Sequence, residues 1–199
     1  MKVRESIPCY GGLQAHTELT GKNHQEVTDA IRKQLLSSAE SFGHFVKFPD
    51  APATDASLLG LAVPYGVVAV DDPIMRKTIE YIESTILRDG GIHRYAGDSY
   101  YGGGAWILLT AWLGWYYVEL AAKCPELTSD LQQKTQACQR WIEAHADANL
   151  NLPEQVAENL NVPSYYPTSV ERWGNIASPL LWSHAKYVIL HLKKIELSK

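Results

Sequence analysis

The sequence predicts an all-helical fold, because apolar residues recur at helical spacing in one stretch after another. Two of these stretches begin with a polar residue followed by proline, a pair that is typical of a helix start. No segment alternates apolar and polar residues convincingly, and the best strand candidate is the short run at 63–70. We therefore expect about seven helices, most of them about 15 to 20 residues long.

The N-terminal third predicts one long helix and two short ones. Asn23 and Glu26 have the spacing of a capping box, and the apolar residues that follow place a long helix from there to about Phe42. Asp55 is an N-cap candidate for a short helix over 55–61. A further short helix is expected around 9–20.

The rest of the chain predicts four longer helices. The pair Asp72-Pro73 opens one that ends at Gly90-Gly91. A second fills 105–123 after three glycines, and a third begins at Pro125 and runs to about His145. The pair Ser178-Pro179 opens the last.

Composition describes an ordinary globular protein of 199 residues, 46% of them hydrophobic. A net charge of −4 argues against nucleic acid or an anionic membrane as the main partner. The 18-residue apolar run at 105–122 contains Glu119 and lacks flanking basic clusters, so a buried helix is expected rather than a membrane span. Three cysteines without metal-ligand spacing and a start without a signal peptide indicate a cytoplasmic location.

Two long connections, 88–104 and 147–178, are expected to carry function and to meet around one pocket. Glu154 lies between proline and glutamine in the second one. Most loop carboxylates are simply solvated. However, Trp173 and Trp182 follow it in the sequence, and a carboxylate among aromatic residues in a cleft can serve as a general acid or base.

The first connection contains Arg94 and Asp98, for which the residues allow two roles equally. They could hydrogen-bond the hydroxyls of a ligand, or they could form an ion pair that only orders the turn. Other chemistry is poorly supported: the glycine triplet lacks a phosphate-binding pattern, and His184 and His191 are too far apart for an easy metal site. We expect no metal and no cofactor.

Five segments together resemble the C-terminal part of the catalytic domain of glycoside hydrolase family 15, the glucoamylases, glucodextranases and related glucosidases. They are DASLLGL (55–61), the DDP stretch (71–82), GGIHRYAGDSYYGGGAW (90–106), LPEQV (152–156) and PLLWSHAKY (179–187). The resemblance implies about the second half of an (α/α)₆ toroid of helical hairpins, with residues 1–199 as one partial catalytic domain. It also implies inverting hydrolysis of α-glucosidic bonds in oligo- and polysaccharides, whereas the linkage (α-1,4, α-1,6 or trehalose-type) stays open.

By this resemblance, Glu154 matches the general base, while Arg94 and Asp98 match residues that bind the glucosyl unit. Tyr101 and Trp106 resemble the aromatic wall of that region, and Trp182 lies in the motif that closes the funnel. The implied ligand is an α-linked gluco-oligosaccharide. Inversion needs a second carboxyl about 6.5–9.5 Å from the first.

The sequence also departs from the family pattern. The family's general acid is a glutamate directly after a tryptophan, and counting back places that pair at or before Met1, so that Glu5 is the nearest acid here. About seven helices are expected here, whereas the resemblance implies twelve in the complete barrel. Helices such as 105–123 would expose apolar faces that the other helices normally cover, which implies a separate N-terminal half or self-association through the barrel edge. The alternative function is a non-catalytic carbohydrate-binding or interaction remnant.

Overall fold

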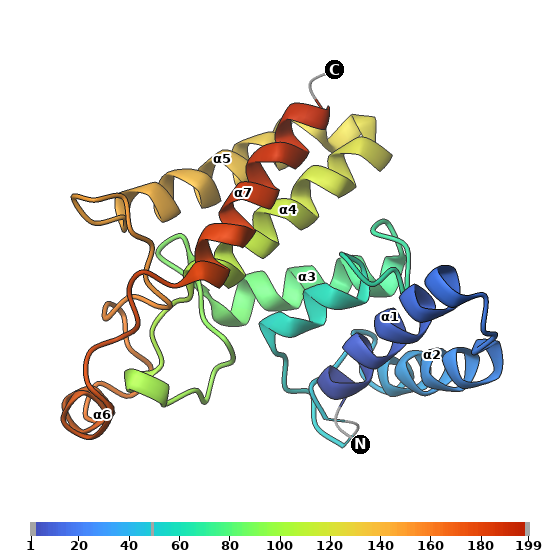
Figure 1. The fold of residues 1–199 in the computed structure, drawn as a ribbon, viewed down its shortest axis with the longest axis horizontal. Helices are drawn as coiled ribbons and strands as arrows, with labels where there is room; N and C mark the ends of the chain where they lie inside the picture. The colour runs from blue at the N-terminus through green and yellow to red at the C-terminus, as the bar shows by residue number, and fades with distance from the viewer. Residues whose placement is uncertain (1–2, 49, 198–199) are drawn as a thin grey trace. The chain divides into compact units, whose positions relative to one another are not determined.

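The computed structural model describes residues 3–48 and 50–197 and contains seven α-helices within them (Figure 1). The chain divides into two compact units, Met1–Ile82 and Glu83–Lys199. The seven helices confirm the all-helical prediction. In the described residues the only strand pairing beyond single bridges is a two-residue hairpin of β1 (Leu87–Arg88) and β2 (Gly91–Ile92).

The first unit is built on the antiparallel contact of α1 (Val3–Thr20) with α2 (Gln25–Glu40). The short helix η1 (Ala56–Leu61) packs against α1 and is almost wholly buried. Asp55 caps it as predicted, because its side chain accepts a hydrogen bond from the Ser57 N–H at 3.0 Å. The same carboxylate forms a buried ion pair with Lys47 at 3.0 Å.

Three predictions for this unit need correction. The helix expected at 9–20 begins at Val3, because α1 continues through Pro8. The capping box does not form: His24 is the N-cap of α2, although Asn23 still accepts a hydrogen bond from the Gln25 N–H. The strand candidate at 63–70 is a turn, since Pro64 has no N–H to donate and Gly66 adopts a positive φ.

Helix α3 (Pro73–Ile86) begins as predicted. The Asp72 carboxylate accepts hydrogen bonds from the N–H groups of Ile74 and Met75, at 2.8 and 3.1 Å. The helix ends at Ile86, four residues before the predicted Gly90, and the β1–β2 hairpin turns the chain there.

The second unit is centred on α4 (Ile107–Lys123), which packs against both α5 (Thr128–Ala144) and α7 (Leu181–Leu197) (Figure 1). A 3₁₀ turn, η3 (Pro125–Leu127), separates α4 from α5. Helix α4 is buried along almost its whole length, so the expectation that 105–123 exposes an apolar face is wrong. No helix in the described residues is long and apolar enough to cross a membrane.

Two further corrections concern the C-terminal part. The connection 147–178 contains a helix that the sequence did not reveal, α6 (Tyr165–Trp173). The last helix begins at Leu181 rather than directly after Ser178. Leu180 is its N-cap: the Leu180 carbonyl accepts from the His184 N–H at 3.3 Å, and the Leu180 N–H donates to the Leu152 carbonyl at 2.9 Å.

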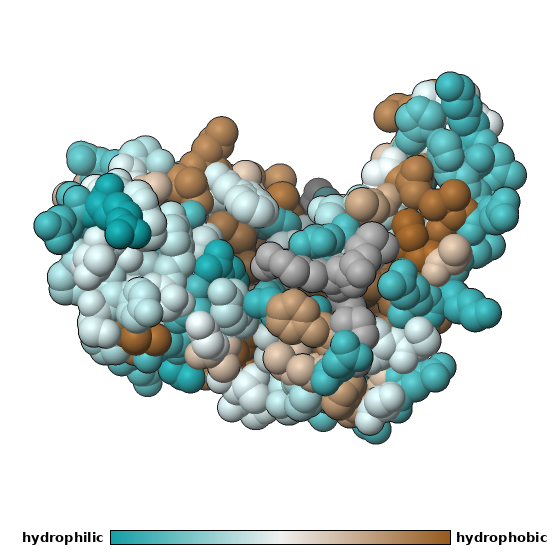
Figure 2. All heavy atoms as spheres, turned by 90° about the horizontal axis from the view of Figure 1, so that it is seen from below, coloured by the Kyte–Doolittle hydropathy of each residue, from teal (hydrophilic) through white to brown (hydrophobic). Residues whose placement is uncertain are grey.

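Hydrophobic side chains also reach the surface, and one face of the molecule shows several of them among hydrophilic neighbours (Figure 2). Many of the large exposed ones belong to α7: Leu181, Trp182, Val188, Leu192 and Ile195. The apolar surface that the sequence led us to expect therefore lies on the last helix and not on α4.

One buried charge stands out where α7 packs on α4. The Lys186 ammonium lies 3.8 Å from the ring centre of Trp112 and 4.9 Å from that of Trp115, and Lys186 is 8% exposed. No oxygen of the described residues accepts a hydrogen bond from it. Burial lowers the pKa of Lys186 to about 8, and the aromatic faces offset only part of the lost hydration.

We predict that Lys186→Met raises the melting temperature at pH 7. The folded state binds the lysine proton less tightly than the unfolded chain, so wild-type stability rises as the pH increases from about 8 towards 10.5. The advantage of the variant should shrink over the same interval. Thermal melts from pH 7 to 10.5 check this, with Lys193→Met as the control: Lys193 pairs with Glu196 at 2.9 Å, and its removal should give no gain. Equal gains in melting temperature for Lys186→Met at pH 7 and at pH 10.5 would show that the charge of Lys186 does not destabilise the fold.

Candidate active site

The two long connections meet, as predicted, because one extended segment joins them. The Val156 N–H donates to the Ala105 carbonyl at 2.9 Å, and the Ile107 N–H donates to the Glu154 carbonyl at 3.2 Å. Between them, Trp106 and Gln155 form an antiparallel bridge. Residues 154–156 thus run alongside 105–107, at the start of α4.

The same segment is fixed to α7 on its other side. Leu152 donates its N–H to the His184 Nε2 at 3.1 Å, and Ser183 donates its hydroxyl to the Pro153 carbonyl at 2.7 Å. The Glu154 N–H donates to the Ala177 carbonyl at 2.9 Å. Both backbone groups of Glu154 are therefore occupied, so its position is set by the starts of two packed helices rather than by a mobile loop.

The glycine triplet makes this close approach of backbones possible. A Cβ at Gly104 would overlap the Val156 carbonyl oxygen, and a Cβ at Gly103 would overlap the Asp98 carbonyl oxygen. Gly103 also has φ +73°, which favours glycine. The Gln155 side chain completes the junction by accepting from the Gly104 N–H and donating to the Tyr100 carbonyl, at 3.1 and 3.3 Å.

Arg94 and Asp98 form a two-pronged ion pair. The Arg94 Nη2 and Nε donate to the two Asp98 oxygens at 2.6 and 3.0 Å, and Asp98 is 1% exposed. The Asp98 carboxylate also accepts from the Tyr100 N–H at 3.2 Å. Of the two roles that the sequence allowed, this geometry fits the ion pair that orders the turn. Asp98 presents little surface to a ligand.

Aromatic rings surround the Arg94 guanidinium. It lies 5.1 Å from the ring centre of Trp106 and 5.6 Å from that of Tyr100, and these two rings are stacked. Tyr100 in turn lies close to Trp173, with centroids 6.2 Å apart. Tyr101 is buried and donates its hydroxyl to the Gly174 carbonyl at 2.9 Å, so it holds the turn η2 (Tyr100–Gly102) against the end of α6.

Glu154 is half-buried beside this cluster. Burial raises the pKa of its carboxyl above the ordinary 4.5, while the positive charge of Arg94 and a hydrogen bond with the Tyr100 hydroxyl act in the opposite direction. Burial together with the negative charge of Glu154 raises the pKa of Tyr100. A carboxyl with one polar partner and a tuned pKa is suited to proton transfer.

Two buried nitrogen atoms close to this cluster lack a hydrogen-bond partner among the described residues, the Trp106 Nε1 and the His93 Nε2. His93 donates its Nδ1–H to the Gly103 carbonyl, 2.8 Å away, and burial lowers its pKa, which favours the neutral ring. Unsatisfied buried polar atoms are uncommon in complete proteins. In native proteins such atoms usually pair with ordered water, a ligand or other polar groups.

The structure brings Glu154, Arg94, Asp98, Tyr101 and Trp106 together. Trp182 is 56% exposed and lies next to Ser183, which holds the Glu154 segment, but no ring contact joins it to the cluster. Glu5, expected as the nearest second acid, lies exposed on α1 in the other unit.

Sequence reasoning missed three residues of the site: Tyr100, Gln155 and Asn161. Asn161 joins the two connections, since its side chain accepts from Arg88 at 2.7 Å and donates to the carbonyls of Tyr95 and Asp98 at 3.3 Å. The sequence offered a weak signal for Tyr100 and Gln155, which are direct neighbours of predicted site residues, and none for Asn161.

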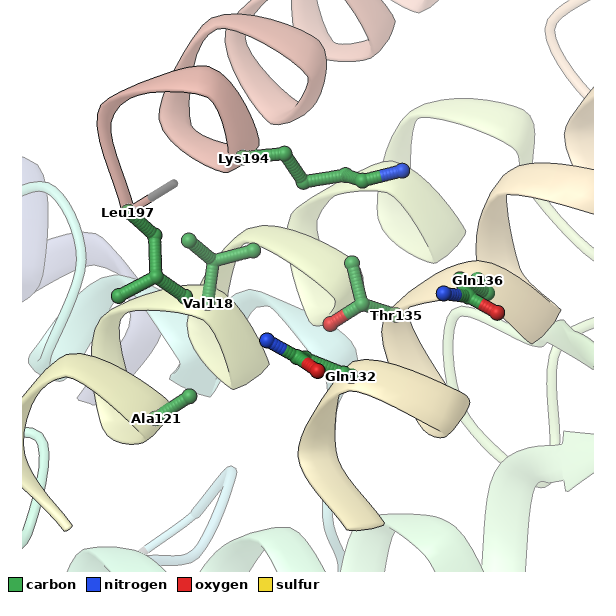
Figure 3. A pocket seen from close by; sticks show the side chains of 7 residues that line it. All are labelled: Val118, Ala121, Gln132, Thr135, Gln136, Lys194 and Leu197. Carbon is green, nitrogen blue, oxygen red and sulfur yellow. The ribbon is translucent and has the colours of Figure 1, made fainter. Parts of the chain in front are cut away.

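No group of three or more metal-ligating side chains occurs in the described residues. The three cysteines are free thiols. A cavity of about 200 Å³ lies among α4, α5 and α7 and is lined by residues such as Gln132, Thr135 and Lys194 (Figure 3). It shares no lining residue with the cluster around Glu154 and is therefore a separate feature.

Comparison with known proteins identifies what this arrangement resembles. The sequence is 44% identical over 163 residues to an isomaltose glucohydrolase from Kribbella flavida, which covers 81% of this chain and 40% of that relative. A solved glycosidase matches 98% of this chain and 52% of its own at 34% identity and a TM-score of 0.86, and a variant of it is described in complex with glucose. No protein-family model matches the sequence.

A bacterial glucoamylase complexed with acarbose matches 99% of this chain at 22% identity and a TM-score of 0.73, a likeness of fold. The fold is thus that of part of an (α/α)₆ helical domain, and the chain is a relative of glycoside hydrolases. It spans about half the length, or less, of the relatives that it matches.

We predict that Asp98→Ala lowers the free energy of unfolding by about 2–4 kcal/mol, because it leaves the Arg94 guanidinium partly buried without its carboxylate. Urea titration measures this. Glu158→Ala is the matched control, since its carboxylate is 70% exposed and should contribute less than about 0.5 kcal/mol. A loss no larger than that of the control would show that the ion pair does not hold the turn.

We also predict that Glu154→Gln raises the melting temperature at pH 7 but not at pH 3. A raised pKa in the folded state means that stability falls as the pH rises through and above 4.5, and the variant escapes this loss. Below that range the protonated wild type and the amide should melt alike. If the variant melts at a lower temperature than the wild type at pH 7, burial does not disfavour the ionised form of Glu154.

Proposed function

We propose that this chain supplies the base-carrying half of a glucoamylase-type glycoside hydrolase of family 15, corresponding to its C-terminal half. The observation that carries the proposal is the position of Glu154. Its backbone is held at both ends between the starts of α4 and α7, and its half-buried carboxyl faces the Tyr100 hydroxyl and the charge of Arg94.

In this role Glu154 removes a proton from a water molecule as the water attacks the anomeric carbon of a terminal glucosyl unit. The reaction inverts the configuration at that carbon. Burial raises the pKa of Glu154, and the positive charge of Arg94 opposes this effect and favours the ionised form that a base requires. The exposed rings of Tyr100 and Trp173 supply flat apolar faces for the sugar, and the buried ring of Trp106 supports Tyr100 from behind.

The reaction also needs a carboxyl that protonates the leaving oxygen. Asp98, the other carboxylate of the cluster, is tied to Arg94. The proposal therefore assigns the general acid to a segment outside this cluster, and the isolated chain should be slower than a complete domain by about 10²–10⁴.

The substrate class is an α-linked gluco-oligosaccharide, which the names of the relatives support. One is an isomaltose glucohydrolase, and a structural relative has been described with glucose. The linkage is open to test with isomaltose, maltose and trehalose in parallel.

The lack of a second available carboxylate in the cluster supports one alternative, a carbohydrate-binding remnant without catalysis. In that case Arg94 and the aromatic rings would bind the sugar while Glu154 only accepts a hydrogen bond. Saturable binding of isomaltose without release of glucose would favour this alternative.

We predict that the purified chain releases glucose slowly from at least one of the three disaccharides and that Glu154→Gln reduces release to background. A coupled glucose assay over several hours measures this. Glu158→Gln, on the same connection but exposed, should retain the wild-type rate. Equal release by the wild type and Glu154→Gln would rule out Glu154 as the base.

A further inference from the structure

A short turn joins α1 to α2 (Figure 1), and two histidine rings meet beside it. The His24 Nε2 lies 2.9 Å from the His16 Nδ1, and the ring centres are 5.0 Å apart. His16 is exposed and lies one turn before the end of α1, whereas His24 is the half-buried N-cap of α2. Both belong to the first unit, and the candidate active site uses neither of them.

The backbone on each side of the turn holds the two rings in place. Gly21 has φ +71° and donates its N–H to the Thr17 carbonyl at 2.8 Å, which ends α1. The His24 carbonyl accepts from the Thr28 N–H at 3.0 Å, while the His24 side chain makes no capping hydrogen bond. The His24 ring therefore contacts His16 instead of capping its own helix.

The distance between the two nitrogen atoms also suits a bound metal ion. A hydrogen bond between neutral imidazoles uses the lone pair of one ring and the proton of the other. When the donor ring changes tautomer, its proton moves to the second nitrogen of the same ring, and both facing nitrogens then carry lone pairs. With metal–nitrogen bonds of about 2.0–2.1 Å, neighbouring ligands of a tetrahedral or octahedral ion are about 2.9–3.4 Å apart. The observed separation of 2.9 Å lies within this range.

The Thr20 hydroxyl adds an oxygen atom beside the pair. Its Oγ1 lies 3.3 Å from the His16 Nδ1 and donates its proton to the His16 carbonyl at 2.7 Å, so that its oxygen is placed to accept a hydrogen bond from a metal-bound water. No group of three or more histidine, cysteine, aspartate or glutamate side chains that could hold a metal occurs in the part of the chain that the structure describes. Water therefore completes the coordination, and ligands of this kind favour Zn²⁺, Ni²⁺ or Cu²⁺ over Mg²⁺ or Ca²⁺.

We propose that the His16 Nδ1 and the His24 Nε2 bind one divalent transition-metal ion, which links the end of α1 to the start of α2. The ion stabilises the first unit, because the unfolded chain does not hold the two rings together. The sequence led us to expect no metal, since only the fold brings these two histidines close to each other. This proposal is independent of the proposed glycosidase function.

Calorimetric titration of the full 199-residue chain with Zn²⁺ tests the proposal and should show one tightly bound ion. His24→Gln should weaken the Kd at least about tenfold, since loss of an outer-shell partner alone costs about 10–100-fold. Its amide can still hydrogen-bond to His16, so the helical hairpin is retained. His191→Gln is the matched control, because His191 is exposed on α7 and has no printed ring contact or hydrogen bond with another described histidine. It should leave the Kd unchanged.

Two results of this titration would overturn the proposal. If His24→Gln binds Zn²⁺ as tightly as the wild type, the ion is bound elsewhere. If the wild type shows no saturable binding, the two histidines form only a hydrogen bond.

Thermal melts and a copper spectrum give independent readouts. Zn²⁺ at about ten times its Kd should raise the melting temperature of the wild type by about 3–6 °C and that of His24→Gln by about 1 °C or less. Mg²⁺ should raise neither. With Cu²⁺, electron paramagnetic resonance should show coupling to two nitrogen atoms in the wild type and to one in His24→Gln. The same nitrogen coupling in both proteins, or a shift in melting temperature that Mg²⁺ reproduces, would contradict the assignment.

Discussion

The pairing of 154–156 with 105–107 is the constraint on which the second unit depends. It brings the two long connections together and also satisfies backbone groups that would otherwise be orphaned at the start of α4. Because Leu152 and Pro153 are hydrogen-bonded to α7 at the same time, the segment fixes α4 and α7 at one end. The candidate site lies at this junction, so the packing of α4 and α7 fixes its geometry.

The charges of the site follow from the same junction. The backbone of Gly103 passes so close to the Asp98 carbonyl that only glycine fits there. The Asp98 side chain is buried, and a buried carboxylate requires a partner such as Arg94. That pair turns the guanidinium towards the rings of Tyr100 and Trp106 and towards the charge of Glu154. Arg94 therefore both compensates the buried charge of Asp98 and opposes the rise in the pKa of Glu154 that burial causes.

The second unit also carries three features that are unfavourable in isolation. Within the described residues, Lys186 is buried without an oxygen partner, and Trp106 and His93 each leave a buried nitrogen without a hydrogen-bond partner. The apolar residues Leu181, Val188, Leu192 and Ile195 of α7 are exposed. Under the proposed function, a neighbouring segment of a larger helical domain would bury these apolar residues of α7 and supply hydrogen-bond partners to the polar atoms.

The sequence alone determined the helical class and the starts of η1 and α3, because apolar periodicity, caps and proline act within a few residues of the chain. The family resemblance singled out Glu154, Arg94, Asp98, Tyr101 and Trp106, which the structure brings together, but not Tyr100, Gln155 or Asn161. The sequence did not reveal α6, the extension of α1 through Pro8, or the start of α7 at Leu181, each of which departs from a local rule or lacks a local signal. It left the roles of Arg94 and Asp98 open, and it placed the exposed apolar surface on the wrong helix. Those points depend on contacts between segments far apart in the sequence, such as Gln155 with Gly104 and Asn161 with Asp98, and no local pattern encodes them.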